Sequence, residues 1–175
     1  AAFIGETMLS SLVGDVTPAP GYWKKIRDVC DSYGVHLILD EVYCGLGRAG
    51  RAYCFEYDDV VPDFVAVGKT LGAGYCPLSA VITKSNFQNI IAEGQGRIQH
   101  GHTHQGHALS VAVALAVQAI VQTDDTLEHI RRMGDLIKKR FIEGLGDHRF
   151  FREVRGRGLA VSMEFDCIDK QKLSA

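Results

Sequence analysis

The sequence predicts an α/β layer in which a mostly parallel sheet is flanked by helices. Short apolar runs that are typical of strands alternate with stretches in which apolar residues recur at helical spacing. The run "VHLILD", residues 35–40, is apolar up to its final Asp, with one interruption at His36, as expected of a parallel strand that is buried on both faces. These two patterns together favour a sheet covered by helices.

The first 40 residues are expected to form a strand, a helix and a second strand. "AAFIGE", residues 1–6, has the apolar character of a strand. In residues 22–34 the side chains of Trp23, Ile26, Cys30 and Tyr33 follow helical spacing, and Gly34 provides a C-terminal stop. The strand at residues 35–40 comes next.

Two further short strands are expected after a loop that contains Gly45, Gly47 and Gly50. "PDFVAVGKT", residues 62–70, predicts a buried strand between Pro62 and Gly68. "PLSAVIT", residues 77–83, predicts another, and "LGAGYC" separates the two.

The second half of the chain predicts two helices and a separate strand. "ALSVAVALAVQAIV", Ala108–Val121, is shorter than the roughly 20 residues that span a bilayer, so we expect a buried helix. Residues 125–145 keep apolar residues at helical spacing with basic residues between them, which predicts an amphipathic helix packed on one face. "GRGLAVSMEF", residues 156–165, is expected to start a separate strand in a smaller domain.

Composition limits the partners that the protein can have. The chain has 175 residues, 46% of them hydrophobic, with 19 basic and 21 acidic side chains. This balance predicts a globular core and offers no field suited to nucleic acid or a membrane surface. The five cysteines are scattered without a Cys-x-x-Cys pair, so we expect no disulfides and a cytoplasmic location. The chain starts without Met inside a strand-like stretch, and we therefore expect a segment of a longer protein.

Asp40 and Lys69 follow two of the predicted strands. Ligands of parallel α/β sheets bind beyond the carboxyl ends of the strands, so both side chains are expected to face one crevice. A lysine desolvated there can attack a carbonyl and form an imine, and a nearby carboxylate can pair with a ring nitrogen of the same molecule. For an arbitrary pair, a turn-capping Asp and a solvated Lys are the commoner roles.

Four blocks in order resemble the class III pyridoxal-phosphate aminotransferases, especially the omega-amino-acid:pyruvate type. They are "LILDEVYCGLGRAG", "PDFVAVGKTLGAGYCPLSAV", "HGHTHQGHALSVAVALA" and "VRGRGLAVSMEF". The resemblance implies a fold-type I enzyme, a homodimer or tetramer with active sites at the subunit interface. It assigns residues 1–122 to the second half of the cofactor-binding large domain, and residues 123–175 to a connecting helix and the start of the small C-terminal α+β domain.

The resemblance also implies the residues that bind pyridoxal 5'-phosphate. Asp40 matches the partner of the ring nitrogen, Lys69 the Schiff-base lysine, and Val42 the side chain that packs on a ring face. Thr103 lies in a block that reaches across the dimer to the cofactor phosphate of the neighbouring subunit. Without the resemblance, Val42 is as readily a core residue, and Thr103 more often a helix cap.

The activity implied is transfer of an amino group from a primary amine or omega-amino acid to a keto acid such as pyruvate, with Lys69 as covalent anchor and then general base.

Glu41 and Arg48 also match family positions, and we expect structural roles for both, in a salt bridge or a loop clamp. "TMLSSLVGD" stands where the family has a Pro and a glycine-rich stretch. The phosphate loop, the ring-stacking aromatic and the carboxylate-binding arginine of the family are not among these residues, so we expect the 175 residues alone to be inactive.

Three other interpretations stay open at this stage. His100, His102, His104 and His107 crowd one segment and could bind a transition metal, as in a metal-dependent hydrolase. No metal-binding acid stands at recognisable spacing beside them. The "GLGRAG" loop is a weak nucleotide-loop signal, because two acidic residues precede it. Finally, the chain could be an inactive fragment that acts only in dimerisation.

Overall fold

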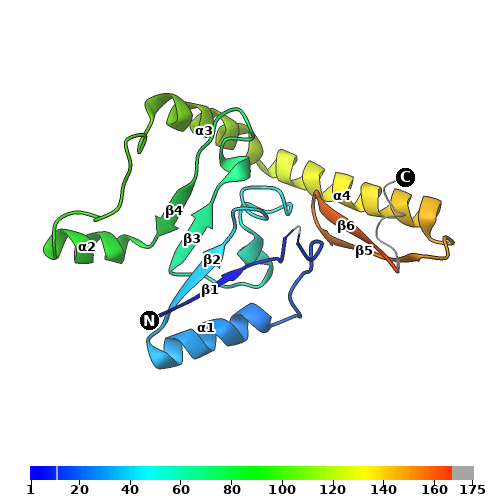
Figure 1. The fold of residues 1–175 in the computed structure, drawn as a ribbon, viewed down its shortest axis with the longest axis horizontal. Helices are drawn as coiled ribbons and strands as arrows, with labels where there is room; N and C mark the ends of the chain where they lie inside the picture. The colour runs from blue at the N-terminus through cyan, green and yellow to red at the C-terminus, as the bar shows by residue number, and fades with distance from the viewer. Residues whose placement is uncertain (11, 167–175) are drawn as a thin grey trace.

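The computed structural model describes residues 1–10 and 12–166, and its centre is a four-stranded sheet (Figure 1). The strands β1 (Ala2–Glu6), β2 (His36–Asp40), β3 (Phe64–Val67) and β4 (Ala80–Thr83) lie in sequence order across the sheet. β1, β2 and β3 are parallel, and β4 pairs with β3 in the antiparallel direction. The predicted mostly parallel sheet is confirmed.

Four α-helices and two short 3-10 helices complete this part of the chain. The three expected helices are confirmed, while α2 was not anticipated. The predicted domain boundary at residues 122 and 123 falls at the break between α3 and α4, and it stays a prediction. The elements are α1 (Tyr22–Tyr33), α2 (Ser85–Glu93), α3 (Ala108–Val121), α4 (Asp124–Leu145), η1 (Cys54–Tyr57) and η2 (Lys69–Leu71).

The core beneath the sheet is formed by α1 and β2. Trp23 and Cys30 of α1 pack with Leu37 and Leu39 of β2, and all four are buried. In β2, His36 is exposed and Ile38 and Asp40 are only partly buried, so burial alternates along the strand. The expectation that β2 is buried on both faces is therefore wrong for the described residues, because α1 covers one face of the strand only.

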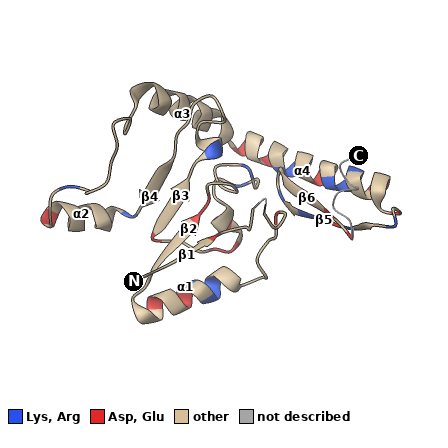
Figure 2. Cartoon of the chain, in the orientation of Figure 1, with Lys and Arg blue, Asp and Glu red and all other residues tan. Residues whose placement is uncertain are grey.

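α3 forms where it was expected, but it is not buried within the described chain. Only Ser110, Ala114 and Val117 are buried, whereas Leu109 and Leu115 are each 68% exposed. The helix packs on η2 and α4 with one side, and no described element covers the other. Figure 2 shows that α3 has no charged residue, while α4 has both acidic and basic ones. The long apolar run thus predicted the helix correctly and its burial wrongly.

In the described residues, no single helix is long and apolar enough to cross a membrane. α3 and α4 together pass a test of length and composition, but they are bent by 72° at the break between them.

A strand forms within residues 156–165 as expected, but it is the second strand of a hairpin that begins before this segment. β5 (Phe151–Arg157) and β6 (Ala160–Phe165) pair in the antiparallel direction, and Gly158 lies between them with a φ of 56°. That left-handed conformation favours glycine, so Gly158 and Leu159 form the turn inside "GRGLAV" and the residues on either side of them pair. The turn lies on the glycine-rich loop, where the Leu159 backbone N–H donates to the Arg48 carbonyl at 2.9 Å.

Gly134 provides a test of how α4 packs on the hairpin. A Cβ atom at this position would overlap the carbonyl oxygen of Gly158, so Gly134→Ala must separate the helix from the turn. We expect a loss of about 1–3 kcal/mol in the free energy of unfolding, measured by urea unfolding of the complete protein. Gly144→Ala is the matched control, because a Cβ there meets nothing within 4 Å. In the same helix it should stabilise the protein by about 0.5–1 kcal/mol. Equal effects of the two changes would contradict this packing.

Asp63 joins α1, β2 and the residue before α2. Its carboxylate accepts hydrogen bonds from Arg27 Nη1 at 2.9 Å, from the Leu37 N–H at 2.8 Å and from Lys84 Nζ at 2.8 Å. Burial by itself raises the pKa of Asp63, but the hydrogen bonds from Lys84, Leu37 and Arg27 outweigh it and lower the pKa to about 2. The ordinary value is 3.8. The charged Asp63 therefore stabilises the fold fully at pH values above its ordinary pKa of 3.8, and this contribution is lost as the pH falls through about 2.

Asp63→Asn is expected to lower the free energy of unfolding by about 2 kcal/mol at neutral pH, because the amide keeps the shape and removes the charge. Urea unfolding at neutral pH and near pH 2 measures the effect. The difference between variant and wild type should shrink in acid, where the wild-type carboxyl group is also protonated. A loss of the same size at both pH values would show that the charge of Asp63 is not the cause.

Candidate functional site

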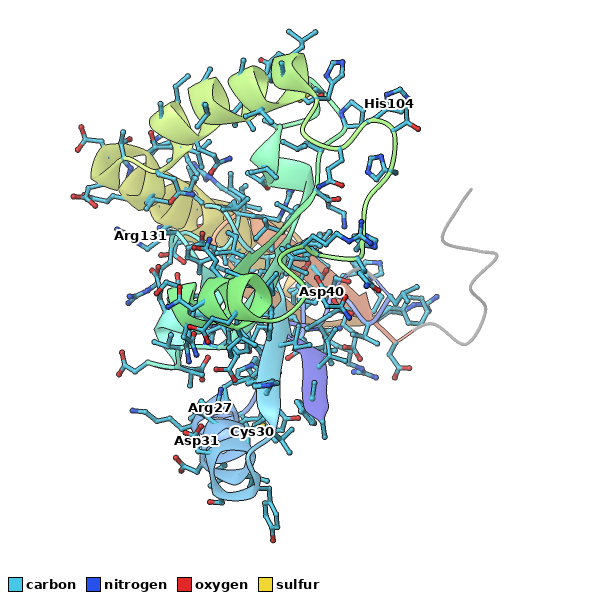
Figure 3. All side chains as sticks on the ribbon, turned by 90° about the vertical axis from the view of Figure 1, so that its left-hand side faces the viewer. Arg27, Cys30, Asp31, Asp40, His104 and Arg131 are labelled. Carbon is cyan, nitrogen blue, oxygen red and sulfur yellow. The ribbon has the colours of Figure 1, made fainter. Side chains whose placement is uncertain are left out.

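Parallel pairing brings Asp40 and Lys69 to the same edge of the sheet. Asp40 is the last residue of β2 and lies opposite Ala66 of β3, and the Glu41 N–H donates to the Ala66 carbonyl at 2.9 Å. Lys69 follows three positions after Ala66. β3 ends at Val67, so Lys69 lies two residues beyond the carboxyl end of the strand that pairs with β2. Figure 3 shows Asp40 at the end of β2 away from Arg27 of α1.

Asp40 uses one of its two carboxylate oxygens locally. Oδ1 accepts a hydrogen bond from the Val42 N–H at 2.9 Å, which makes a turn of the Asx type. Oδ2 makes no hydrogen bond with the described residues. Val42 itself packs against the residue before the lysine, because a Cβ on Gly68 would lie 3.3 Å from Val42 Cγ1. Asp40, Val42 and Lys69 are thus brought together at one edge, while the turn-capping role of Asp40 is also present.

Lys69 starts the short helix η2 in an unusual conformation. Its φ of 41° lies in the left-handed region, which costs a non-glycine residue about 1 kcal/mol or more. Gln118 of α3 holds the helix in place, since its Nε2 donates to the carbonyls of Thr70 at 3.0 Å and Leu71 at 3.2 Å. The Lys69 side chain is exposed. The desolvation expected from a buried crevice is therefore not provided by the described residues.

The Tyr43 ring lies near the Lys69 amine, and Arg48 lies near the same ring. The Lys69 Nζ lies 5.9 Å from the centroid of the Tyr43 ring, and the Arg48 guanidinium carbon lies 5.3 Å from the same centroid. Arg48 Nε donates to the Tyr43 carbonyl at 2.9 Å, and its Nη2 lies 3.4 Å from Thr70 Oγ1. Arg48 therefore clamps the loop to η2, as expected from its structural assignment.

Glu41, next to Asp40, is fully inside the protein. It is 1% exposed and accepts hydrogen bonds from the backbone N–H groups of Cys54 at 2.7 Å and Phe55 at 2.8 Å. Burial raises the pKa of Glu41 to about 7, against the opposing effect of these two donors. The structural role expected for Glu41 is confirmed, with backbone donors in the place of a salt bridge.

An open cavity of about 1640 Å³ lies beside Lys69. Among the described residues, its wall contains basic and imidazole side chains and no Asp or Glu, which suits an anionic group such as a phosphate. Its volume exceeds the roughly 300–1,000 Å³ of usual small-ligand pockets, so the described residues enclose it only in part. The ionisable side chains on the wall, apart from Tyr75 and Cys76, are those of Arg48, Lys69, His102, His104 and His107.

Thr103 stands apart from the other predicted site residues. It is exposed and does not line the cavity, although its neighbours His102 and His104 do. His104 lies in the loop before α3, well separated from Asp40 in Figure 3. The helix cap is made by His107, whose Nδ1 accepts from the Ser110 N–H at 3.3 Å. Thr103 is thus not the cap, and its contact with a second subunit stays a prediction.

Two residues near Lys69 were missed by the sequence analysis. The sequence analysis assigned no role to Tyr43, because nothing in the pattern of "DEVYC" indicates which way its ring turns. Gln118 had a usable signal, because it is one of two polar residues in the apolar helix α3, the other being Ser110. A lone amide inside an apolar run is expected to have a hydrogen-bonding partner, and here the partners are the carbonyls of η2.

Comparison with known proteins shows the family to which this chain belongs. The family model "Aminotransferase class-III" matches residues 1–174. An aminotransferase of Gibberella zeae is 41% identical over 165 residues, which cover 94% of this chain and 32% of the relative. An aminotransferase structure from Bacillus anthracis superposes with a TM-score of 0.91 at 32% identity, over 99% of this chain and 40% of that one.

A third similar protein bears on the cofactor. The ornithine aminotransferase of Toxoplasma gondii, whose structure is described with pyridoxal phosphate in its active site, has a TM-score of 0.84 at 34% identity and covers 95% of this chain and 38% of its own. The cofactor implied by the sequence resemblance is thereby confirmed for this group of enzymes. The chain spans about a third of the length of the curated relatives that it matches. By sequence and by fold, this chain belongs to the class III aminotransferases.

Proposed function

We propose that the complete protein is a transaminase that moves an amino group from a primary amine or omega-amino acid to a keto acid such as pyruvate. The observation that supports this most directly is the placement of Lys69 and Asp40 at adjacent ends of parallel strands, with Val42 against the residue before the lysine. An amine, a carboxylate and an apolar side chain at one sheet edge fit an aromatic aldehyde, and the cavity wall, which includes Lys69 but neither Asp40 nor Val42, fits its phosphate.

The roles of the residues follow from their chemistry. Bound pyridoxal phosphate supplies an electron sink for the carbanion formed at the substrate carbon. The Asp40 carboxylate would hold a proton on the ring nitrogen. The Lys69 amine would hold the aldehyde, and as a free amine it would serve as the general base for the substrate proton. Proton transfer by a positioned group contributes about a hundred- to ten-thousandfold in rate.

The proposal includes a homodimer, or a tetramer, in which Thr103 contacts the cofactor phosphate of the neighbouring subunit. Its exposed position beside two cavity-lining histidines supports a contact outside its own chain. We also place the protein in the cytoplasm, in line with four free cysteines among the described residues. Cys167 lies outside those residues.

Covalent capture of the cofactor tests the proposal. The complete protein is mixed with pyridoxal phosphate, scanned for an imine absorbance band, reduced with borohydride and digested for mass spectrometry. We expect the pyridoxyl group on Lys69, together with amine-dependent formation of alanine from pyruvate. Absence of the band, or labelling of another lysine in an active protein, would overturn the assignment. A module that acts only in dimerisation would show neither label nor turnover.

The metal-dependent hydrolase receives no support from the side-chain arrangement. In residues 1–10 and 12–166, no group of three or more His, Cys, Asp or Glu side chains is placed to hold a metal ion. Two of the histidines act on the local backbone, because His102 Nδ1 accepts from the His104 N–H and His107 caps α3.

A further inference from the structure

We propose that Tyr43 is a positioning residue, whose ring holds the Lys69 amine over the edge of the sheet before the cofactor is captured. This inference rests on the proposed function, since it assigns Lys69 the covalent role. It is carried by the 5.9 Å approach of Lys69 Nζ to the Tyr43 ring centroid and by the exposure of the lysine.

Lys69 needs such a partner because little else restrains its side chain. It is exposed, and its ammonium group forms no ion pair with an acidic residue of the described chain. A lysine side chain has several rotatable bonds, and ordering it costs conformational entropy. The face of an aromatic ring attracts a cation within about 6 Å of its centroid. The Tyr43 ring therefore favours conformers in which the amine stays near the ring.

The Tyr43 residue is itself held at its backbone, and its hydroxyl end lies near Asp15. Arg48 binds the Tyr43 carbonyl at 2.9 Å and places its guanidinium carbon 5.3 Å from the ring centroid. At the other end, burial and the nearby Asp15 carboxyl group raise the pKa of Tyr43, so the hydroxyl stays protonated. Asp15 is 2% exposed and is fixed by Ser162 of β6, whose Oγ donates to Asp15 Oδ2 at 2.6 Å.

The rate of cofactor capture by the apo form of the complete protein tests the inference. Tyr43→Leu removes the ring and is expected to slow formation of the covalent adduct about two- to fivefold, the effect that one exposed cation–π contact supplies. Tyr43→Phe keeps the ring and should restore the wild-type rate. The adduct is followed by its absorbance and by circular dichroism, across a range of pH, with labelling of Lys69 checked by mass spectrometry.

Tyr57→Leu is the matched control. Tyr57 packs on the same core cluster as Tyr43, faces two guanidinium groups and donates its hydroxyl hydrogen to the Ala49 carbonyl at 2.8 Å, but it has no contact with Lys69. It should lower stability without slowing capture.

The outcomes separate the two proposals. If Tyr43→Leu captures the cofactor on Lys69 at the wild-type rate, the positioning role is overturned and the proposed function stands. Equal slowing by Tyr43→Phe, or by Tyr57→Leu, overturns it as well, because the ring at this position is then not the cause. If the wild-type protein carries no label on Lys69, the proposed function fails first.

Discussion

Replacing Lys69 by alanine is expected to abolish covalent capture of pyridoxal phosphate and to leave only trace transamination. The variant lacks the amine that forms the bond to the aldehyde and also the group that moves the substrate proton. The second role alone corresponds to a loss of about a hundred- to ten-thousandfold in turnover. The measurement is the imine absorbance band of the purified complete protein, followed by the rate of keto acid consumption with an amine donor.

The change should leave the fold in place, because Lys69 is exposed and Gln118 holds the backbone that follows it, at the carbonyls of Thr70 and Leu71. Lys25→Ala is a suitable control, since Lys25 is an exposed lysine on α1, away from the cavity wall. It should retain both the band and the activity. Full activity of Lys69→Ala would refute the role of this lysine, whatever the control shows.

The strand-end positions of Asp40 and Lys69 could be predicted because they depend on short-range patterns. Each follows an apolar run bounded by Gly or Pro, and parallel pairing then brings any two such ends to one edge. The same logic does not predict the direction of side chains beyond the strand. The ring of Tyr43 contacts Arg48, 5 positions along the chain, and the η2 helix that Lys69 begins is held by Gln118, 49 positions along the chain from Lys69.

Burial was predicted less well than secondary structure. The apolar runs of β2 and α3 indicate that these residues avoid water, but not which element covers them. In the described chain α1 covers one face of β2, and the outer side of α3 has no cover.

The hairpin was missed for a different reason. A glycine inside an apolar alternation is compatible with a strand or with a turn, and only its contact with Gly134 and the Arg48 loop decides for the turn.

Asp40→Asn is expected to weaken cofactor binding and to slow transamination more strongly. The amide oxygen can still accept the hydrogen bond from the Val42 N–H, so the turn after β2 is retained and the charge alone is removed. Loss of a hydrogen bond to a charged group corresponds to about 10- to 100-fold in cofactor affinity. Removal of a fixed charge that stabilises the reacting state costs about a hundredfold or more in rate. Fluorescence titration with pyridoxal phosphate measures the affinity, and steady-state kinetics at saturating cofactor measures the rate.

A comparison with Asp63→Asn separates the charge at the site from stability in general. Both changes replace a partly buried carboxylate of the same sheet by an amide, but Asp63 lies at the other end of the strands, bound to Arg27 and Lys84. Asp63→Asn should unfold at lower urea concentration and keep its cofactor affinity. Asp40→Asn should unfold at the wild-type urea concentration and bind the cofactor more weakly. Its stability is retained because Oδ2 of Asp40 has no partner among the described residues to lose. Near-normal kinetics at saturating cofactor for Asp40→Asn would mean that the protein maintains the ring proton by another group, and Asp40 would then be a turn residue only.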